Sequence, residues 1–481
     1  MTRPSPTQPS RAPSSLALAA LLAACASPPP TTPPAELGVA VPATWSTPTA
    51  PATNLLPADW WRTFGDAQLD RLMAAAFAGN FDLRAATARL EAAVAARTIA
   101  GAPLLPELDA GFDAQRSRRL FLGFPFGGGG VPSSTTTTFG LSLSMRWELD
   151  LWGRVRAGDA AALADQAAAV ADLAGARLSL TAQVCRAWFA AVEAGQQLQL
   201  AEATVAAFRA TSDDVQDRFR RGLRPALDVH LAATNLANAE ANVSQRRDQL
   251  QRARRQLDVL AGRFPDGRAE LATTLPALPD AVPAGLPGEL LQRRPDLVAA
   301  ERRVAAAGCR VEQARAALYP RLALTASGGT SSTELEDLVD DDFRLWSLGA
   351  NLLQPLFRNG ALRADVDQKA ARRAEALAQY GNAVLRAFAE VENTLAATAE
   401  LDARRAALAA AARHAAAARD LARERWQRGI TDFLAVADGQ RQAFQAESAL
   451  LTIERQRLEN RIDLVLALGG GFAATAEECQ P

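Results

Sequence analysis

Two hydrophobic patterns alternate along this chain, one with a period of two residues over short stretches and one with a period of seven over long ones. In segments 107–117 and 138–149, apolar residues alternate with polar residues or glycine. Segments 321–329 and 344–354 repeat this alternation more weakly. A period of two predicts β-strands with one apolar and one polar face. The sequence therefore predicts four strands, arranged as two pairs.

Each predicted strand pair contains a long connection. The first runs from Ser117 to Thr137 and includes four consecutive glycines, Gly127 to Gly130. The second runs from Gly329 to Phe343 and is acidic. Such composition favours loops.

Long helical hairpins are predicted after each strand pair. From about Arg156 to Arg221 there is no proline, and alanine dominates. Apolar residues there recur on one seven-residue phase, at Leu163, Val170, Val184, Ala191, Leu198, Val205 and Phe219. This spacing predicts a coiled-coil helix roughly 100 Å long. We expect one hairpin over 156–262 and a second over 362–468.

The two halves of the chain repeat one another. Equivalent features recur at a nearly constant spacing, namely Pro106 and Pro320, Trp152 and Phe357, and Gly222 and Gly429. A spacing far beyond solenoid periods indicates one duplicated half-structure. We expect a first repeat over 59–262, an equatorial linker over 263–294, a second repeat over 295–470 and a tail over 471–481.

The N-terminus has the pattern of an export signal. Arg3 and Arg11 precede an apolar stretch, 16–23, that is too short to span a bilayer but typical of a signal peptide. The following Cys25 completes a sequence that resembles a bacterial lipobox, so we predict a lipoprotein signal peptide over 1–24 and covalent lipid on Cys25 as the only attached group. An ordinary signal peptide with a chance cysteine is the alternative. Segment 25–58 is rich in proline, threonine and alanine and is expected to form a spacer without a core.

The composition argues against several functional classes. The net charge of −1 gives no basic excess for binding nucleic acid. His230 and His414 lie far apart and lack neighbours at metal-ligand spacing. No glycine-rich phosphate loop follows a predicted strand. We therefore expect no catalytic residues, no metal and no enzymatic activity.

The strands are the only predicted elements able to cross a membrane. Beyond the signal, no run of eighteen apolar residues occurs. Only helices and closed barrels span bilayers, and four strands cannot close one, since the smallest barrels have about eight. Three copies would supply twelve strands and leave room for a lumen, so we predict a homotrimer. Two hairpins of a soluble sandwich are the alternative.

Several motifs follow the order known in one family. They are Asp59-Trp60-Trp61-Arg62-Thr63-Phe64-Gly65-Asp66, the segment Trp147 to Arg154, Arg293-Arg294-Pro295-Asp296-Leu297, Gln354-Pro355-Leu356-Phe357, and Gly429 followed by Phe433-Leu434 and Asp438. On these motifs the chain resembles the bacterial outer-membrane efflux family, the TolC-like channels. The resemblance extends from Cys25 to about Gly471 and is strongest to the lipoprotein branch that serves drug-efflux pumps of the resistance-nodulation-division type.

The resemblance implies a fold and a function. The fold is mainly α with a transmembrane β-barrel, in which a trimer forms a twelve-stranded barrel in the outer membrane and a twelve-helix tunnel in the periplasm. The function is a passive exit duct for small molecules, fed by an inner-membrane pump through a periplasmic adaptor (a membrane fusion protein). Two alternatives stay open: a type I secretion-like duct for protein or polysaccharide, and a non-conducting lipoprotein scaffold that spans the periplasm.

The resemblance also implies a periplasmic gate at the hairpin tips, where acidic residues face the axis. Asp438 matches that motif, Asp228 matches an acidic position after the first turn, and Asp432 lies at the second turn. When the apolar seams of the two hairpins are aligned, His230 stands where Asp438 stands in the other repeat. Like charges at a constriction raise proton affinity and attract cations, which predicts a closed, cation-preferring tip. Solvated carboxylates near helix starts are the alternative.

The turns at the tips carry glycines and arginines. The residues assigned to the tip turns and to adaptor contact are Gly222, Arg224, Gly429, Arg425 and Arg428. The arginines could pair with Asp228 or Asp432 on neighbouring helices, or form a solvated or adaptor-contact surface.

Overall fold

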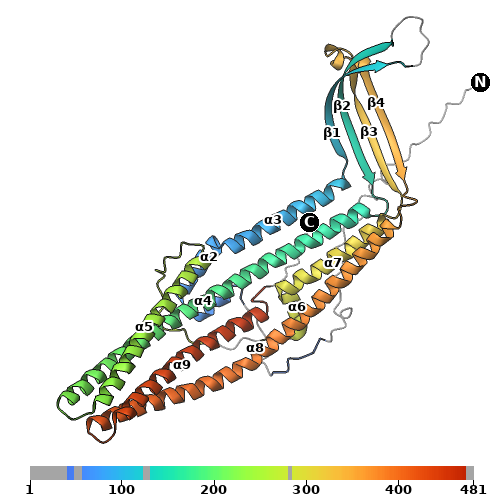
Figure 1. Ribbon diagram of the computed structural model, residues 1–481. Helices are drawn as coiled ribbons and strands as arrows, with labels where there is room; N and C mark the ends of the chain where they lie inside the picture. Colours follow the sequence, from blue (N-terminus) through green and yellow to red (C-terminus); the bar gives the residue numbers. More distant parts are fainter. Residues whose placement is uncertain (1–40, 48–56, 123–130, 280–283, 473–481) are drawn as a thin grey trace, which may run out of the picture. The chain divides into compact units, whose positions relative to one another are not determined.

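The computed structural model describes residues 41–47, 57–122, 131–279 and 284–472 (Figure 1). The described residues form two compact units: unit 1 contains 99–164 and 305–370, and unit 2 contains the rest. Each unit takes residues from both sequence repeats. The repeats are therefore not separate compact domains. Cys25 lies outside the described residues.

Unit 1 contains a four-stranded antiparallel sheet in the order β1-β2-β3-β4. The strands are β1 (Glu107–Leu120), β2 (Ser133–Leu149), β3 (Arg321–Ser332) and β4 (Arg344–Leu353). β2 and β3 come from different repeats and pair with each other, which explains why the repeats do not separate.

The strands extend into stretches that the sequence assigned to loops. β1 continues to Leu120, and β2 begins at Ser133. Serine and threonine dominate the start of β2, and threonine favours strands. In the second pair, β3 continues to Ser332, and two short helices follow, η4 (Glu336–Val339) and η5 (Asp341–Phe343). The four glycines at 127–130 lie outside the described residues.

The strand registers gather the alternating residues onto two faces of the sheet. Leu143 stands opposite Ala110 on β1 and Gly328 on β3, and Met145 stands opposite Leu108. One face is therefore apolar, with Leu108, Phe112, Leu141, Leu143, Leu348 and Leu352 about half exposed or more. The opposite face carries Asp109, Asp113, Ser144, Arg146, Ser327, Ser347 and Asn351.

The long helices reproduce the duplication in their lengths. The first hairpin consists of α4 (Arg154–Arg220) and α5 (Ala226–Leu260), and the second of α8 (Ala361–Gln427) and α9 (Phe433–Ala467). α4 and α8 both have 67 residues, and α5 and α9 both have 35. One constant shift along the sequence, which takes Gly222 to Gly429, relates all the corresponding helix ends. We call it the hairpin shift.

Shorter helices complete the chain. They are η2 (Trp60–Phe64), α2 (Ala67–Gly79), α3 (Phe81–Gly101), η3 (Ala102–Leu104), α6 (Pro287–Arg293) and α7 (Pro295–Ala316).

Side chains next to the helix ends account for several helix starts. The Asp66 carboxylate accepts from the N–H groups of Gln68 and Leu69 and so caps α2. Asn80 caps α3 by accepting from the Leu83 N–H at 3.0 Å. The Asp150 carboxylate accepts from two N–H groups in the first turn of α4. Each contact satisfies donors that a helix start leaves without partners.

Unit 2 has two main apolar clusters. The first includes Trp60, Leu69, Trp188, Phe189 and Leu257 and joins η2 and α2 to α4, α5 and α9. The second joins α6 and α7 to α8 and α9 and includes Leu297, Tyr380 and Val384. Trp45 also belongs to the second cluster.

The burial of Trp45 corrects the expectation that segment 25–58 takes no part in a core. Trp45 is buried, its ring lies edge-on to Phe388, and its Nε1 donates to the Gly285 carbonyl at 2.9 Å. The next residue, Ser46, donates its N–H to Glu392 at 2.6 Å. Part of the spacer therefore docks on α8.

No helix among the described residues is both long enough and apolar enough to cross a membrane.

Candidate functional site

The tips of the two hairpins have the same backbone geometry. At the first, Gly222 has φ of +73°, and the N–H groups of Gly222 and Leu223 donate to the carbonyls of Phe219 and Arg218. At the second, Gly429 has φ of +74°, and Gly429 and Ile430 donate to Trp426 and Arg425. Both are Schellman motifs, which require a left-handed residue that glycine adopts without steric cost. The sequence predicted both glycines as turn residues.

A buried tryptophan joins the two tips. Trp426 of α8 is 2% exposed and packs in a cluster with Val215 of α4, Ala232 of α5, and Phe433 and Val436 of α9. Its ring centroid lies 6.2 Å from that of Phe433. The cluster therefore ties the first hairpin to the second at their turns.

Two arginines cover the Trp426 ring. The guanidinium carbon of Arg218 lies 4.3 Å from the ring centroid, and that of Arg224 lies 5.7 Å away. Arg218 is also held by Asp214, at 3.1 Å. Such cation–π contacts explain why Arg224, one of the predicted tip residues, is half-buried.

The predicted acidic gate residues have different local roles. The Asp432 carboxylate accepts from the Ala435 N–H at 3.0 Å and caps α9. Asp438 lies further along the same helix, where it pairs with Arg441 and accepts from Gln442 Nε2 at 2.5 Å. Asp228 is half-buried in the first turn of α5. All three lie near the tips, Asp228 on α5, Asp432 at the start of α9 and Asp438 within α9.

The correspondence between His230 and Asp438 is wrong by one position. The ends of α5 and α9 are related by the hairpin shift, under which the structural counterpart of Asp438 is Leu231 and that of His230 is Ala437. His230 is exposed on α5. Apolar residues of the helical seam recur in both repeats at neighbouring positions, so the seam alone does not distinguish two alignments that differ by one residue.

The arginines of the tips do not form the expected pairs within the chain. Arg428, which lies just after α8, pairs with Glu424 of α8 at 2.5 Å, and Arg224 lies on Trp426. Arg425 is exposed. Among the residues with described positions, no ion pair joins these arginines to Asp228 or Asp432.

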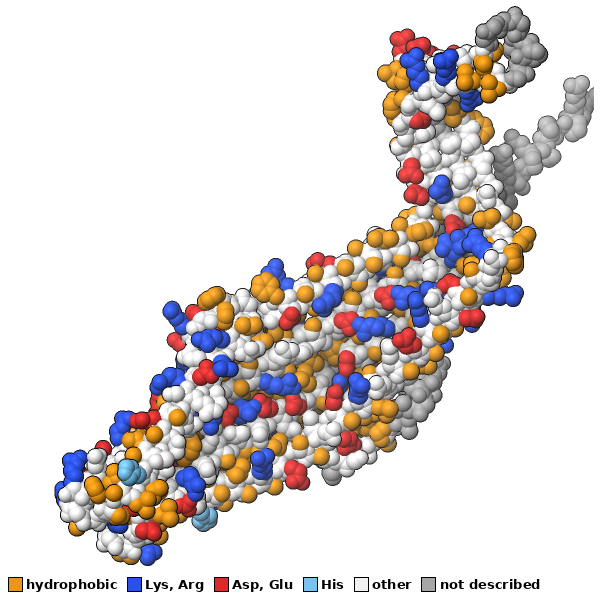
Figure 2. All heavy atoms as spheres, in the orientation of Figure 1, with side chains coloured by type: hydrophobic (Ala, Val, Ile, Leu, Met, Phe, Trp, Pro, Cys, Tyr) orange, Lys and Arg blue, Asp and Glu red, His pale blue; other side chains and the backbone are white. Residues whose placement is uncertain are grey.

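The tips also have an apolar part that was not predicted from the sequence. Leu223, Leu227, Ile430 and Leu434 are each about 60% exposed or more. The hairpin shift takes Leu223 to Ile430 and Leu227 to Leu434, so these positions are equivalent. Figure 2 shows hydrophobic side chains exposed among the arginines where the hairpins turn. The recurrence of apolar residues at equivalent positions beside the two arginine-rich turns is the sequence signal that predicts this surface.

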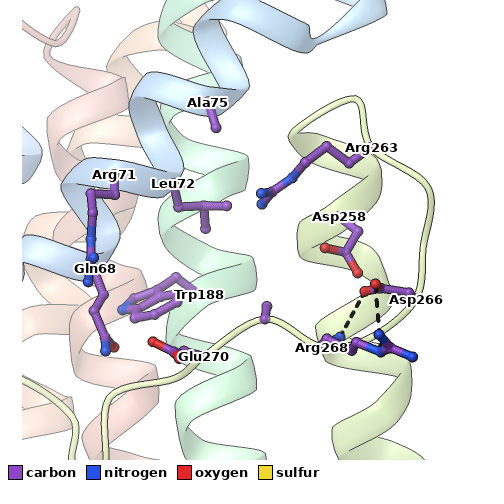
Figure 3. Close-up of a pocket in the computed structure, with 11 residues that line it drawn as sticks. Gln68, Arg71, Leu72, Ala75, Trp188, Asp258, Arg263, Asp266, Arg268 and Glu270 are labelled. Carbon is purple, nitrogen blue, oxygen red and sulfur yellow. Dashed lines mark hydrogen bonds and ion pairs between the residues drawn. The ribbon is translucent and has the colours of Figure 1, made fainter.

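A separate hollow of about 370 Å³ lies in unit 2, between α2, α4 and the segment after α5 (Figure 3). Its charged lining residues are Arg71, Arg263, Arg268, Asp258, Asp266 and Glu270. The two signs balance, Asp266 pairs with Arg268, and Asp258 accepts from the Gly267 N–H at 3.0 Å. Within the described ranges no group of three metal-ligating side chains occurs. The hollow therefore offers no chemistry that competes with the tips.

Comparison with known proteins decides the family. The model of the family described as "Outer membrane efflux protein" matches residues 72–263 and 286–470. The chain belongs to the outer membrane efflux protein family. It is an outer-membrane component of an efflux system, as the sequence motifs predicted.

The similarity of this efflux protein to individual relatives extends over nearly the whole chain. It is 34% identical over 477 residues to the pyoverdine export outer membrane protein OpmQ of Pseudomonas putida, covering 95% of this chain and 97% of that protein. It is 32% identical over 414 residues to the toluene efflux pump outer membrane protein TtgF, also of Pseudomonas putida, with 86% and 85% covered. The solved outer-membrane channel OprN matches with a TM-score of 0.83 at 30% identity, with 93% and 99% covered. The predicted fold class is thus confirmed as that of an outer-membrane efflux channel.

Proposed function

We propose that three copies of this chain form a passive duct that carries small molecules out through the outer membrane. The observation that carries this proposal is the sheet of unit 1. It has one apolar face, suited to lipid, and one polar face, suited to a wet lumen. Among the described residues, its outer strands β1 and β4 each have a partner on one side only. Open edges are not tolerated in lipid, so the strands of other copies must complete the sheet.

Small residues on the polar face support a lumen. Gly111, Gly140, Gly329 and Gly349 all lie on that face, opposite polar partners such as Ser142 and Thr325. These glycines and the neighbouring serines have short side chains or none, so little of the enclosed space would be filled. Twelve strands from three copies would then enclose an open passage instead of a side-chain core.

The partners we propose are a periplasmic adaptor and an inner-membrane pump of the resistance-nodulation-division type. Support comes from the membership in the efflux family and from the exposed leucines and isoleucine of the tips. An apolar surface of this kind, ringed by arginines, is typical of a protein–protein contact. Pyoverdine export and toluene efflux, named for the relatives, favour small-molecule cargo over protein or polysaccharide.

The tips are the proposed gate of the duct. Three-fold symmetry would bring three copies of Asp438, and of Asp228, around one axis, where their charges favour cations. Asp432 fixes the start of α9 and so the direction of the preceding turn. Arg425, Arg428 and His230 are exposed near the tips, and we propose that they contact the adaptor.

The lipid on Cys25 is proposed as an additional membrane anchor. A lipid attachment of this kind adds affinity for the bilayer without taking part in conduction. Cys25→Ser should abolish the lipid mass and leave trimers that still conduct. Loss of conduction in that variant with intact trimers would contradict the role assigned to the anchor.

Planar-bilayer recording of the purified protein tests the duct directly. We expect stepwise, cation-preferring currents, and a weaker cation preference for Asp438→Asn. Asp217→Asn, an exposed acid paired with Arg220 on α4, serves as the matched control. Assembled protein that conducts no ions under any applied voltage, even after the tips are altered by Asp438→Asn and Asp228→Asn together, would contradict the proposed function.

A further inference from the structure

The joint between two copies can be deduced from a joint that already exists inside the chain. The strands β2 and β3 belong to different repeats, yet they pair continuously from Phe139 opposite Ser332 to Leu149 opposite Leu322. The outer strands β1 and β4 are the repeat counterparts of β3 and β2. Because β2 pairs with β3, we expect its counterpart β4 to pair in the same way with the β1 strand of another copy.

The register of β1 with β2 is repeated without change in the register of β3 with β4. Glu107 on β1 stands opposite Arg146 on β2. The shift that takes Pro106 to Pro320, which we call the strand shift, takes Glu107 to Arg321. The hairpin shift takes Arg146 to Leu353. Arg321 and Leu353 stand opposite each other in the structure, so the two shifts together convert the first pairing into the second.

Applying these two shifts to the joint of β2 and β3 fixes a register for the missing joint. Arg146 opposite Thr325 becomes Leu353 opposite Gly111. In the assembly proposed above, β4 of one copy meets β1 of the next copy, and we propose the register of that antiparallel joint, with Leu353 opposite Gly111 and Arg344 opposite Leu120. This inference rests on the proposed assembly and adds the identity of its contact residues.

The lengths of the strands support this register. β4 begins at Arg344 and β1 ends at Leu120, so the two ends coincide in the proposed joint. Every residue of β4 then finds a partner within β1. A shift of the register by two positions would set these two strand ends two residues apart.

The chemistry of the facing residues also agrees. Leu352 would stand opposite Phe112 on the apolar face, and Asn351 opposite Asp113 on the polar face. Ser347 would stand opposite Ser117, and this pair extends a row of serines that already crosses three strands, Ser144, Ser327 and Ser347. A shift by one position would mix the two faces and is excluded on that ground.

Solvent exposure also supports the proposed joint between β4 and β1. Leu149 and Leu322 face each other within the chain and are partly buried. Their counterparts, Leu356 and Leu108, are 92% and 65% exposed. The proposed joint places Leu356 opposite Leu108 of the next copy. Both leucines are therefore exposed in a single chain and would be covered in the assembly.

Cysteine cross-linking tests the register. The double variant Ser347→Cys/Ser117→Cys places two cysteines opposite each other across the joint, within disulfide reach. Each copy would link to both neighbours, so mild oxidation should convert the assembled protein into a covalent trimer on a denaturing gel. The pair Ser347→Cys/Gln115→Cys is shifted by two positions, about 8 Å between Cα atoms, and should link only weakly.

Three controls define the result. The parent chain, oxidised in the same way, accounts for its own cysteines. Each single variant, Ser347→Cys or Ser117→Cys, should give no covalent trimer, because the two positions lie on different strands. Ser144→Cys/Ser327→Cys, a facing pair within one chain, should lose its free thiols on oxidation without gaining mass as an oligomer.

The outcomes separate this inference from the proposed function. Linking of position 347 to position 115 and not to position 117, in protein that is trimeric in detergent, would overturn the register and leave the duct intact. Parent protein that is not trimeric would overturn the duct itself. If the serine variants fail to assemble, Asn351→Cys/Asp113→Cys tests the same register with the same expected link.

Discussion

Gly262 packs directly against the backbone carbonyl of Gly79, and it has a φ of +66°. A Cβ atom at this position would overlap that carbonyl oxygen. Gly469, the counterpart of Gly262 under the hairpin shift, stands in the same relation to the carbonyl of Arg293. Each returning helix of a hairpin is therefore locked at its end to the end of a short helix, α2 in one case and α6 in the other.

Replacing this glycine should destabilise unit 2. Gly262→Ala forces an alanine into the left-handed region, which costs at least about 1–2 kcal/mol, and adds the overlap with Gly79. We expect a lower melting temperature of the assembled protein, followed by helical circular dichroism. Gly195→Ala, in the middle of α4 with open space around its Cα, is the matched control and should be neutral or stabilising by up to about 1 kcal/mol. Equal melting temperatures for both variants would show that the lock contributes nothing.

Arg294 holds the end of α9 in the second repeat, as Asn80 holds the end of α5 in the first. Its guanidinium donates to Asp296, to Glu390 at 2.6 Å and to the carbonyl of Ala467, as Asn80 donates to the carbonyl of Leu260 in the first repeat. Burial of Arg294 opposes its charge, but the hydrogen bonds and charges of Asp296 and Glu390 outweigh burial and raise its pKa.

Arg294→Met should therefore cost about 1–3 kcal/mol, because it leaves the buried carbonyl of Ala467 without its donor, while Asp296 and Glu390 are half exposed and stay solvated. Chemical denaturation followed by circular dichroism measures this cost. Arg294 and Arg386 both line a second hollow of unit 2, of about 420 Å³, between the start of α7 and α8. Arg386 is exposed there, so Arg386→Met is the control. A cost for Arg294→Met no larger than that for the control would refute the structural role.

Trp426 is expected to hold the tips together. Trp426→Ala removes the ring that packs between both hairpins, and a change of this size in a core costs about 3–5 kcal/mol. Because the cluster is local, we expect the tips to open while the rest of unit 2 stays folded.

Limited trypsin digestion reports this opening, since Arg221, Arg224, Arg425 and Arg428 surround the turns. Cleavage there should be markedly faster in Trp426→Ala and little changed in Leu434→Ala, which removes an exposed side chain of the same tip. Uniform cleavage along the chain would instead indicate global unfolding.

Tyr380 should make stability fall in alkali. Burial, and to a smaller extent the charge of Glu301, raises its pKa to about 12. The neutral phenol is favoured in the folded state, so this contribution is complete below the ordinary tyrosine pKa of about 10 and is lost as pH rises toward 12. In Tyr319→Phe, Tyr380 is the only tyrosine, and its ultraviolet absorbance should titrate near pH 12 while the protein is folded. Tyr380→Phe should flatten the fall of stability between about pH 10 and 12.

Periodicity was enough to predict the four strands and the long helices of this fold. The four strands and the long helices follow from periods of two and seven, because burial on one face imposes those periods directly. The strand ends near Leu120 and Ser133 were missed, since serine and threonine are common in both loops and strands. The compact units could not be predicted, because the pairing of β2 with β3 joins segments from opposite halves of the chain.

The candidate site was predicted only in part. Gly222 and Gly429 could be found because a left-handed turn demands glycine. Trp426 was missed, since a single tryptophan near a turn does not reveal that four helices meet there. The predicted correspondence between His230 and Asp438 was wrong because the apolar seams align equally well one position apart. Only the ends of α5 and α9 distinguish the two alignments.

The mass of the detergent-solubilised protein, measured by native mass spectrometry, shows directly whether three copies assemble. We expect a complex of three copies, held together by strands that a single chain leaves without partners. A protein that is monomeric or dimeric under conditions in which its strands and helices remain folded would contradict this expectation.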